Sequence, residues 1–158
     1  MDLLFLFEWL DNSMLAHLSK ASGGVFAMIQ TIHLASMAML GGMILVSDLR
    51  LLNLLMTDVP APTVVDGAQK WINVALVAMV LSGIFMASAV AIKLYYNLFF
   101  WSKMAGLAMG LVFLYGIKLP LIRRHGDRLS PWLVRLVALA SLTIWFSVAA
   151  SGRWIGFS

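Results

Sequence analysis

Four long apolar stretches dominate the pattern of hydrophobic and polar positions along this chain. The first, residues 21–47, contains no Asp, Glu, Lys or Arg. It is longer than the roughly 20 residues that a helix needs to cross the hydrocarbon core of a bilayer. Three further stretches have the same character and are separated by charged or proline-containing segments. The pattern therefore predicts four membrane-spanning helices, at about residues 23–47, 71–92, 99–117 and 132–152.

The segments around these stretches predict different structures. Residues 2–20 place apolar side chains at helical spacing but carry too many charges to span, so we expect an amphipathic helix in the membrane interface. The run 11–13 breaks it, with Asn12 or Ser13 capping a second piece. Residues 48–70 contain Pro60 and Pro62 and predict a loop that leads into a new helix. Lys118 and Pro120 are expected to close the third span.

Composition agrees with this pattern and narrows the class of protein. Hydrophobic residues make up 62% of the 158 residues and charged residues only 11%, with a mean hydropathy of +0.94. Soluble domains contain about 45–50% apolar and about 25% charged residues. The apolar runs are continuous rather than alternating, which excludes a transmembrane barrel. The fold class predicted is all-α, a single integral membrane domain over residues 1–158, built as a four-helix bundle with an N-terminal interfacial amphipathic helix.

The positive charges predict the orientation of the bundle. The chain has 11 Lys and Arg residues and a net charge of +4. Lys and Arg are more frequent in cytoplasmic loops. The segments 48–70 and 118–135 hold seven of them: Arg50, Lys70, Lys118, Arg123, Arg124, Arg128 and Arg135. We therefore expect a multi-pass protein of the bacterial inner membrane with both termini on the non-cytoplasmic side, which contacts the lipid bilayer and no nucleic acid.

His33 is the candidate for chemistry, because it is the one ionisable side chain deep in the first span. An ionisable group at that depth is a functional candidate by default. A buried imidazole can hold a metal as the axial ligand of a b-type haem. Lys103 and Arg153 are expected near the same membrane surface, where cations would pair with the haem propionates. His33, Lys103 and Arg153 thus form the predicted cofactor site, with His33 as the metal ligand.

Other interpretations of these residues stay open. His33 is also explained by a structural hydrogen bond to Gln30, Ser36 or a neighbouring helix, or by a quinone or proton-relay role. The second haem ligand is not evident from the sequence. Lys103 and Arg153 are each also explained by snorkelling to headgroups. The candidates for that second ligand are His17, His125, Met86, Met104 and Met109.

The remaining patterns concern packing and ion pairing. Asp48 and Arg50 are expected to satisfy each other or to cap the first span. Small residues recur at four-residue spacing, as at Gly106 and Gly110, and predict close helix approach. The chain has no Cys, which excludes disulfides, thiolate metal sites and c-type haem attachment.

The set of motifs favours a protein without catalytic activity of its own. No paired intramembrane carboxylates, Ser/His/Asp set, phosphate-binding loop or dinucleotide fingerprint can be assembled. We expect a small integral membrane subunit or anchor of a larger, electron-transport-related complex with other membrane-protein subunits as partners. The alternative is a b-type haem- or quinone-binding electron-transfer protein that uses His33, and a small transporter fits less well.

Short motifs over most of the chain resemble an uncharacterised family of small bacterial four-span membrane proteins. They are Trp9-Leu10, Ile32-His33, Gly41, Asp48-Leu49-Arg50-Leu51-Leu52, Ser82-Gly83, Tyr95 to Asn97, Phe100, Lys103, Ser141-Leu142, Trp145 and Gly152-Arg153. That family has no established activity, but it is distantly similar to membrane cytochrome b and copper-resistance D type bundles, and this similarity favours a haem. Many members have a His in the stretch that corresponds to residues 115–118, and this chain has none there. If that His is a ligand in relatives, this chain uses another residue or has lost the ligand.

Overall fold

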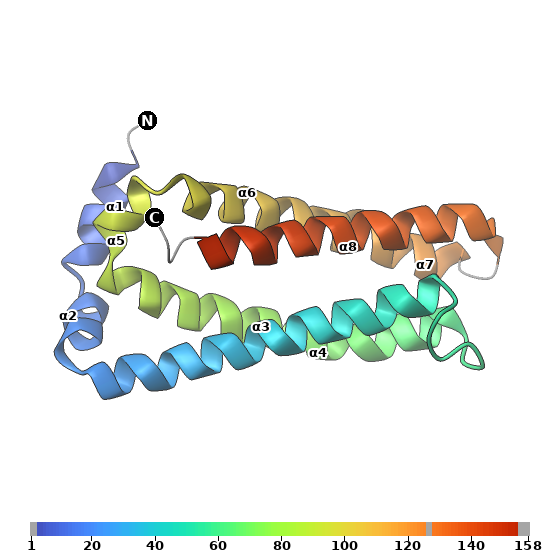
Figure 1. Ribbon diagram of the computed structural model, residues 1–158, viewed down its shortest axis with the longest axis horizontal. Coiled ribbons are helices and arrows are strands. Elements are labelled where there is room, and N and C mark those ends of the chain that lie inside the picture. The colour runs from blue at the N-terminus through green and yellow to red at the C-terminus, as the bar shows by residue number, and fades with distance from the viewer. Residues whose placement is uncertain (1–2, 126–127, 155–158) are drawn as a thin grey trace.

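Two long helical hairpins form the protein. The structure is a computed structural model that describes residues 3–125 and 128–154. Four helices in it are long and apolar enough to cross a membrane. They are α3 (Gly23–Leu51), α4 (Ala61–Ala89), the continuous stretch of α6 (Leu98–Val112), η1 (Phe113–Lys118) and α7 (Leu119–His125), and α8 (Pro131–Trp154). The helix α3 packs along α4 and α6 packs along α8, and the two pairs meet mainly through α3 and α8 (Figure 1).

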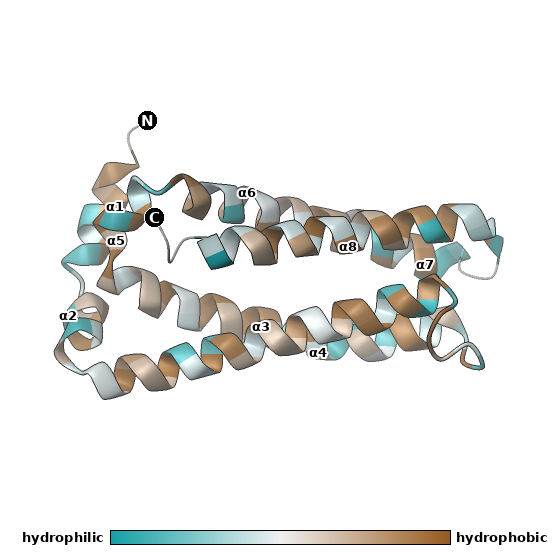
Figure 2. Cartoon of the chain, viewed as in Figure 1, coloured by the Kyte–Doolittle hydropathy of each residue, from teal (hydrophilic) through white to brown (hydrophobic). Residues whose placement is uncertain are grey.

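The core lies between the hairpins, while much of the outer surface remains apolar. One buried cluster includes Leu40, Ile44, Ile72 and Leu114, and a second lies nearer the α3–α4 loop. Large side chains such as Phe146, which is 67% exposed, point outward along the spans. Hydrophobic residues run along the bundle in Figure 2. Such a surface suits a helix bundle that lipid tails cover, so the protein is a multi-pass membrane protein in contact with the bilayer.

The expected loop over residues 48–70 is wrong in its extent. The helix α3 continues to Leu51, and α4 already begins at Ala61, so the connection covers only residues 52–60. Pro62 lies in the first turn of α4, where its missing N–H would have no partner in any case. Val64, Val65 and Ala68 are buried. Burial of this face therefore makes the start of α4 helical.

The expected end of the third span at Lys118 and Pro120 is also wrong, because the helix continues to His125. A proline inside an α-helix collides with the carbonyl four residues earlier, here that of Gly116. The six residues before Leu119 form the wider π-helix η1, which includes Gly116. We infer that this local widening accommodates Pro120 without ending the helix.

Short helices precede the first span, as predicted, and complete the all-α fold. The break falls between α1 (Leu4–Asp11) and α2 (Met14–Ala21), where the Ser13 hydroxyl accepts a hydrogen bond from the Ala16 N–H at 3.2 Å. The helix α2 lies against α4, and α1 lies against α5 (Ala91–Tyr95). Phe7 and Tyr95 join the latter two by an edge contact with ring centroids 5.4 Å apart. The interfacial position of α1 and α2 stays a prediction.

The small residues of α6 lie where α8 approaches. A Cβ on Gly106 would lie 2.9 Å from Cγ2 of Val148, and one on Gly110 would lie 3.2 Å from the Trp145 ring. The absence of side chains at these two positions lets α8 pack closely against α6.

Candidate functional site

The imidazole of His33 contacts the neighbouring helix α4. His33 lies ten residues after Gly23, about 15 Å along α3. Its Nδ1 atom is 2.9 Å from Oγ of Ser82. Gln30 is exposed, and the Ser36 hydroxyl donates to the carbonyl of Ile32. The structural partner of His33 is therefore on a neighbouring helix, and neither Gln30 nor Ser36 bonds to it.

The hydrogen bonds of Ser82 indicate the tautomer of His33. The Ser82 hydroxyl donates to the carbonyl of Ala78 at 2.6 Å. Since a hydroxyl has a single proton, Ser82 accepts from His33, and Nδ1 carries the imidazole proton. The lone pair then lies on Nε2, and the backbone of Met79 on α4 is a further hydrogen-bond partner of the imidazole. Many metal-ligating histidines are likewise oriented by a hydrogen bond at Nδ1.

Gly83 makes room for this ring. A Cβ at position 83 would lie 3.3 Å from Cε1 of His33 and 3.8 Å from Nδ1. Any larger residue would have to displace the imidazole by a few tenths of an ångström. The pair Ser82-Gly83 thus holds the ring on one side and leaves space for it on the other.

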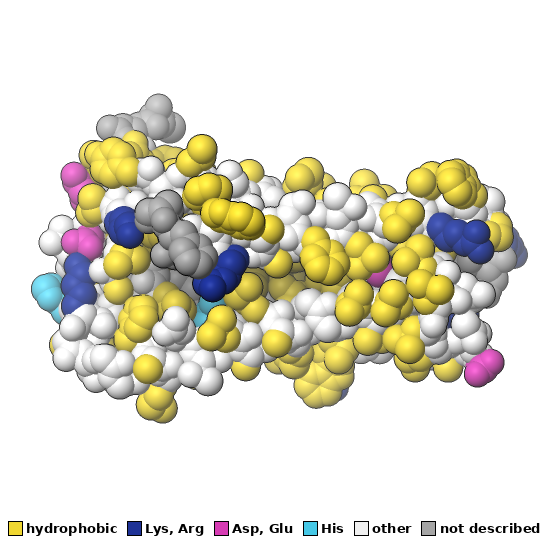
Figure 3. Space-filling model, viewed as in Figure 1, with side chains coloured by type: hydrophobic (Ala, Val, Ile, Leu, Met, Phe, Trp, Pro, Cys, Tyr) yellow, Lys and Arg dark blue, Asp and Glu magenta, His cyan; other side chains and the backbone are white. Residues whose placement is uncertain are grey.

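Lys103 and Arg153 lie at the same end of the bundle, near the start of α6 and the end of α8. The side chain of Lys103 runs along Gly152, with Nζ 3.5 Å from the place of a Cβ on that glycine. Lys103 is also near enough to His33 for electrostatic interaction. Arg153 follows Gly152 on α8 and is exposed. In the space-filling view, Lys and Arg side chains lie toward the two ends of the bundle and hydrophobic side chains lie along its length (Figure 3).

The candidates for a second haem ligand differ in exposure and in position along the bundle. Met104 and Met109 are exposed, and His17 is exposed on α2. His125 ends α7, at the other end of the bundle. Met86 follows Ser82 by one helical turn and is half-buried, so it lies on the same side of α4 as the hydroxyl that holds His33.

A buried ion pair that the sequence did not predict lies toward the other end. Nζ of Lys118 is 2.5 Å from Oδ1 of Asp48, and the two side chains are 1% and 0% exposed. The same ammonium donates to the Ser47 hydroxyl at 2.7 Å. The buried Ser141 hydroxyl of α8 lies beside the Asp48 carboxylate but forms no well-aligned hydrogen bond with it. This cluster joins α3, η1 and α8.

The expected pairing of Asp48 with Arg50 is therefore wrong. Residues two apart on a helix point in different directions, which is a signal the sequence already contained. Arg50 donates instead to the loop, with Nε 2.7 Å from the carbonyl of Val59. Asp48 points into the core toward Lys118.

The fold and the composition of the described helices define the class of protein. The chain is a multi-pass helical membrane protein, and its described residues contain no group of three or more His, Cys, Asp or Glu side chains that could hold a metal ion. Residues 6–158 match a family of unknown function, DUF6644, and the chain belongs to that family. No curated protein and no solved structure matches it.

Proposed function

We propose that the protein is a small integral membrane subunit, or anchor, of a larger complex related to electron transport. The described helices leave only short connections outside the spans, such as residues 52–60. We place the protein in the bacterial inner membrane with both termini on the non-cytoplasmic side. The reason is that Lys and Arg are concentrated in residues 48–70 and 118–135, at the end of the bundle away from the termini.

The main support for a partner subunit is an exposed side-chain amide on the outer face of α4. Asn73 lies near the middle of α4 and is exposed. Its Oδ1 accepts hydrogen bonds from Gln69 at 2.7 Å and from Tyr115 at 2.6 Å. Within the described residues its NH₂ group donates to no acceptor. An unpaired donor in hydrocarbon is costly, so this face is suited to a neighbouring helix with a hydrogen-bond acceptor.

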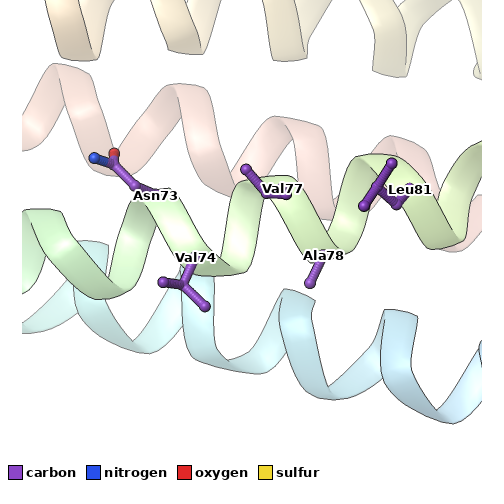
Figure 4. Close-up of a pocket in the computed structure, with 5 residues that line it drawn as sticks. All are labelled: Asn73, Val74, Val77, Ala78 and Leu81. Carbon is purple, nitrogen blue, oxygen red and sulfur yellow. The ribbon is translucent and has the colours of Figure 1, made fainter.

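The surface beside this amide has the shape to receive such a helix. A shallow depression of about 460 Å³ runs along α4 from Asn73 to Leu81. Its other lining residues are Val74, Val77 and Ala78, all apolar (Figure 4). Small and β-branched side chains beside one polar group are typical of contacts between transmembrane helices.

Gentle isolation from native membranes tests this proposal. We expect the protein to migrate with partner subunits, and we expect Asn73→Leu to lower the recovered complex several-fold because the polar contact is lost. Thr143→Leu is the control, since Thr143 is exposed on α8 and already donates to the carbonyl of Leu139. Circular dichroism checks that both variants fold. A wild-type protein that migrates alone as a monomer in every mild detergent would reject the proposal.

The orientation of His33 favours a second function, the binding of a b-type haem or a quinone for electron transfer. With Nδ1 held by Ser82, Nε2 is the ring nitrogen suited to axial ligation, and Lys103 and Arg153 supply positive charge for propionates. The resemblance to membrane cytochrome b and copper-resistance D type bundles points the same way. The chain offers Met86 as the neighbouring residue suited to complete the coordination.

A reduced-minus-oxidised spectrum of haem-replete protein checks this second function. We expect Soret and α bands that disappear in His33→Ala and persist in His17→Ala, because His17 is exposed on α2. Bands that are absent from the wild type, or unchanged in His33→Ala, would end the haem proposal. Quinone extracted from the wild type and missing from His33→Ala would support the quinone form instead.

A further inference from the structure

A pocket with two arginines opens at the end of the bundle away from His33. It has a volume of about 400 Å³ and lies between the end of α3, the connection to α4 and the start of α8. Arg50 lines it from α3 and Arg135 from α8. None of the described residues that line it is acidic. The pocket thus brings together two positive charges that are far apart in the sequence.

The guanidinium of Arg50 is held in place without being neutralised. Nε donates to the carbonyl of Val59 at 2.7 Å, and weaker contacts run from Nη1 to Asn53 Oδ1 at 3.4 Å and from Nη2 to the carbonyl of Thr57 at 3.5 Å. All three acceptors are neutral. The neighbouring carboxylate of Asp48 is paired with Lys118. Since a guanidinium has five N–H donors, two remain available.

Arg135 adds a second guanidinium to the pocket. It lies in the second turn of α8 and is exposed. Within residues 3–125 and 128–154 it forms no ion pair. Two like charges around one pocket repel each other unless an anion lies between them, and guanidinium groups match phosphate oxygens in geometry.

The position of the pocket identifies the source of the anion. Arg50 lies in the last turn of α3, and Arg135 lies near the first turn of α8, so both are at the level where a span leaves the hydrocarbon. Trp132 is 69% exposed on the first turn of α8, as expected for a residue among headgroups. Leu129 and Val134 provide apolar walls beside the arginines. Basic pockets between helices at this depth bind anionic lipid headgroups.

We propose that this pocket binds the phosphate of an anionic phospholipid, with the glycerol and first acyl carbons against Leu129 and Val134. Arg50 supplies a hydrogen-bonded guanidinium from α3 and Arg135 an exposed one from α8, so the phosphodiester bridges the two helices. This site would connect the two hairpins through a lipid. It depends on the membrane location of the chain and not on the partner subunit or on the cofactor at His33.

The full chain in phosphatidylcholine nanodiscs is suited to the test. Dihexanoylphosphatidylglycerol is added and the melting temperature Tm is followed, with dihexanoylphosphatidylcholine and inorganic phosphate as comparisons. We expect phosphatidylglycerol alone to raise Tm. Arg135→Gln should weaken the apparent affinity about tenfold, the loss expected for one charge-assisted hydrogen bond. Arg124→Gln is the control. Arg124 is an exposed cation at the same end of the bundle but does not line the pocket, so its loss should change the affinity less than about twofold.

Each result decides the proposal. Equal weakening by Arg135→Gln and Arg124→Gln would indicate a diffuse positive surface and overturn the site. An equal rise of Tm with inorganic phosphate would assign the pocket to a free anion, and an equal rise with phosphatidylcholine would remove the role of charge. Arg50→Gln should weaken the apparent affinity at least as much as Arg135→Gln. If that variant does not fold, Arg135→Gln still decides, because the Arg135 side chain forms no hydrogen bond in the described chain.

Discussion

Replacing Lys118 by methionine should lower the free energy of unfolding by about 3–5 kcal/mol, because it leaves the carboxylate of Asp48 buried without its counter-charge. Asp48 is fully buried, and Lys118 is its ion-pair partner. The same substitution removes the hydrogen bond to Ser47. The measurement is unfolding of the purified protein in mixed micelles by titration with dodecyl sulfate, followed by circular dichroism.

The double variant Asp48→Leu/Lys118→Met distinguishes a buried unpaired charge from a simple loss of packing. A pair that apolar residues replace together is often neutral in stability, so the double variant should regain most of what Lys118→Met loses. Lys70→Met is the matched control, since Lys70 is exposed on α4. It should stay within about 0.5 kcal/mol of the wild type. A Lys118→Met variant as stable as Lys70→Met would show that the pair does not stabilise the fold.

Gly106→Val is expected to destabilise the contact of α6 with α8 by about 1–3 kcal/mol, the usual cost of an overfilled interface. Even a single Cβ at this position would lie 2.9 Å from Cγ2 of Val148. The β-branched Val148 has little rotational freedom to move away. The same dodecyl sulfate titration measures the loss.

Gly41→Val provides the comparison within one chain. A Cβ on Gly41 would meet no atom within 4 Å, and the residue is exposed on α3. The free energy of unfolding of Gly41→Val should therefore equal that of the wild type or exceed it slightly. If both variants lost the same amount, helix flexibility rather than close packing would explain the role of Gly106.

The membrane-spanning architecture was largely predictable from the order of residues along the chain. Long apolar runs must form helices in lipid, because only a helix satisfies its own backbone hydrogen bonds within one segment. The break at Ser13 was equally local, since a serine caps the helix that begins directly after it. The spacing of Gly106 and Gly110 likewise marked a packing face without any knowledge of the partner helix.

The candidate sites were predictable only in part. His33 was evident from the sequence because it is the one ionisable group in a run of apolar residues. Its partner Ser82 was not evident, because it lies 49 positions away and meets His33 only through the alignment of α3 with α4. Lys118 was predicted to close the third span and Asp48 to pair with Arg50 or cap the first span. The two residues are 70 positions apart and form one buried pair instead.

The sequence by itself thus determined that four helices lie in lipid and where one imidazole sits along the first of them, since hydropathy and capping act over a few residues. Only the tertiary structure decided that the third span continues past Pro120, that Lys118 pairs with Asp48, and that Arg50 and Arg135 share a pocket. The physical reason is that these features depend on the rotation and offset of one helix against another. Side-chain packing and buried charge set that offset, and they act between residues that the linear order keeps apart.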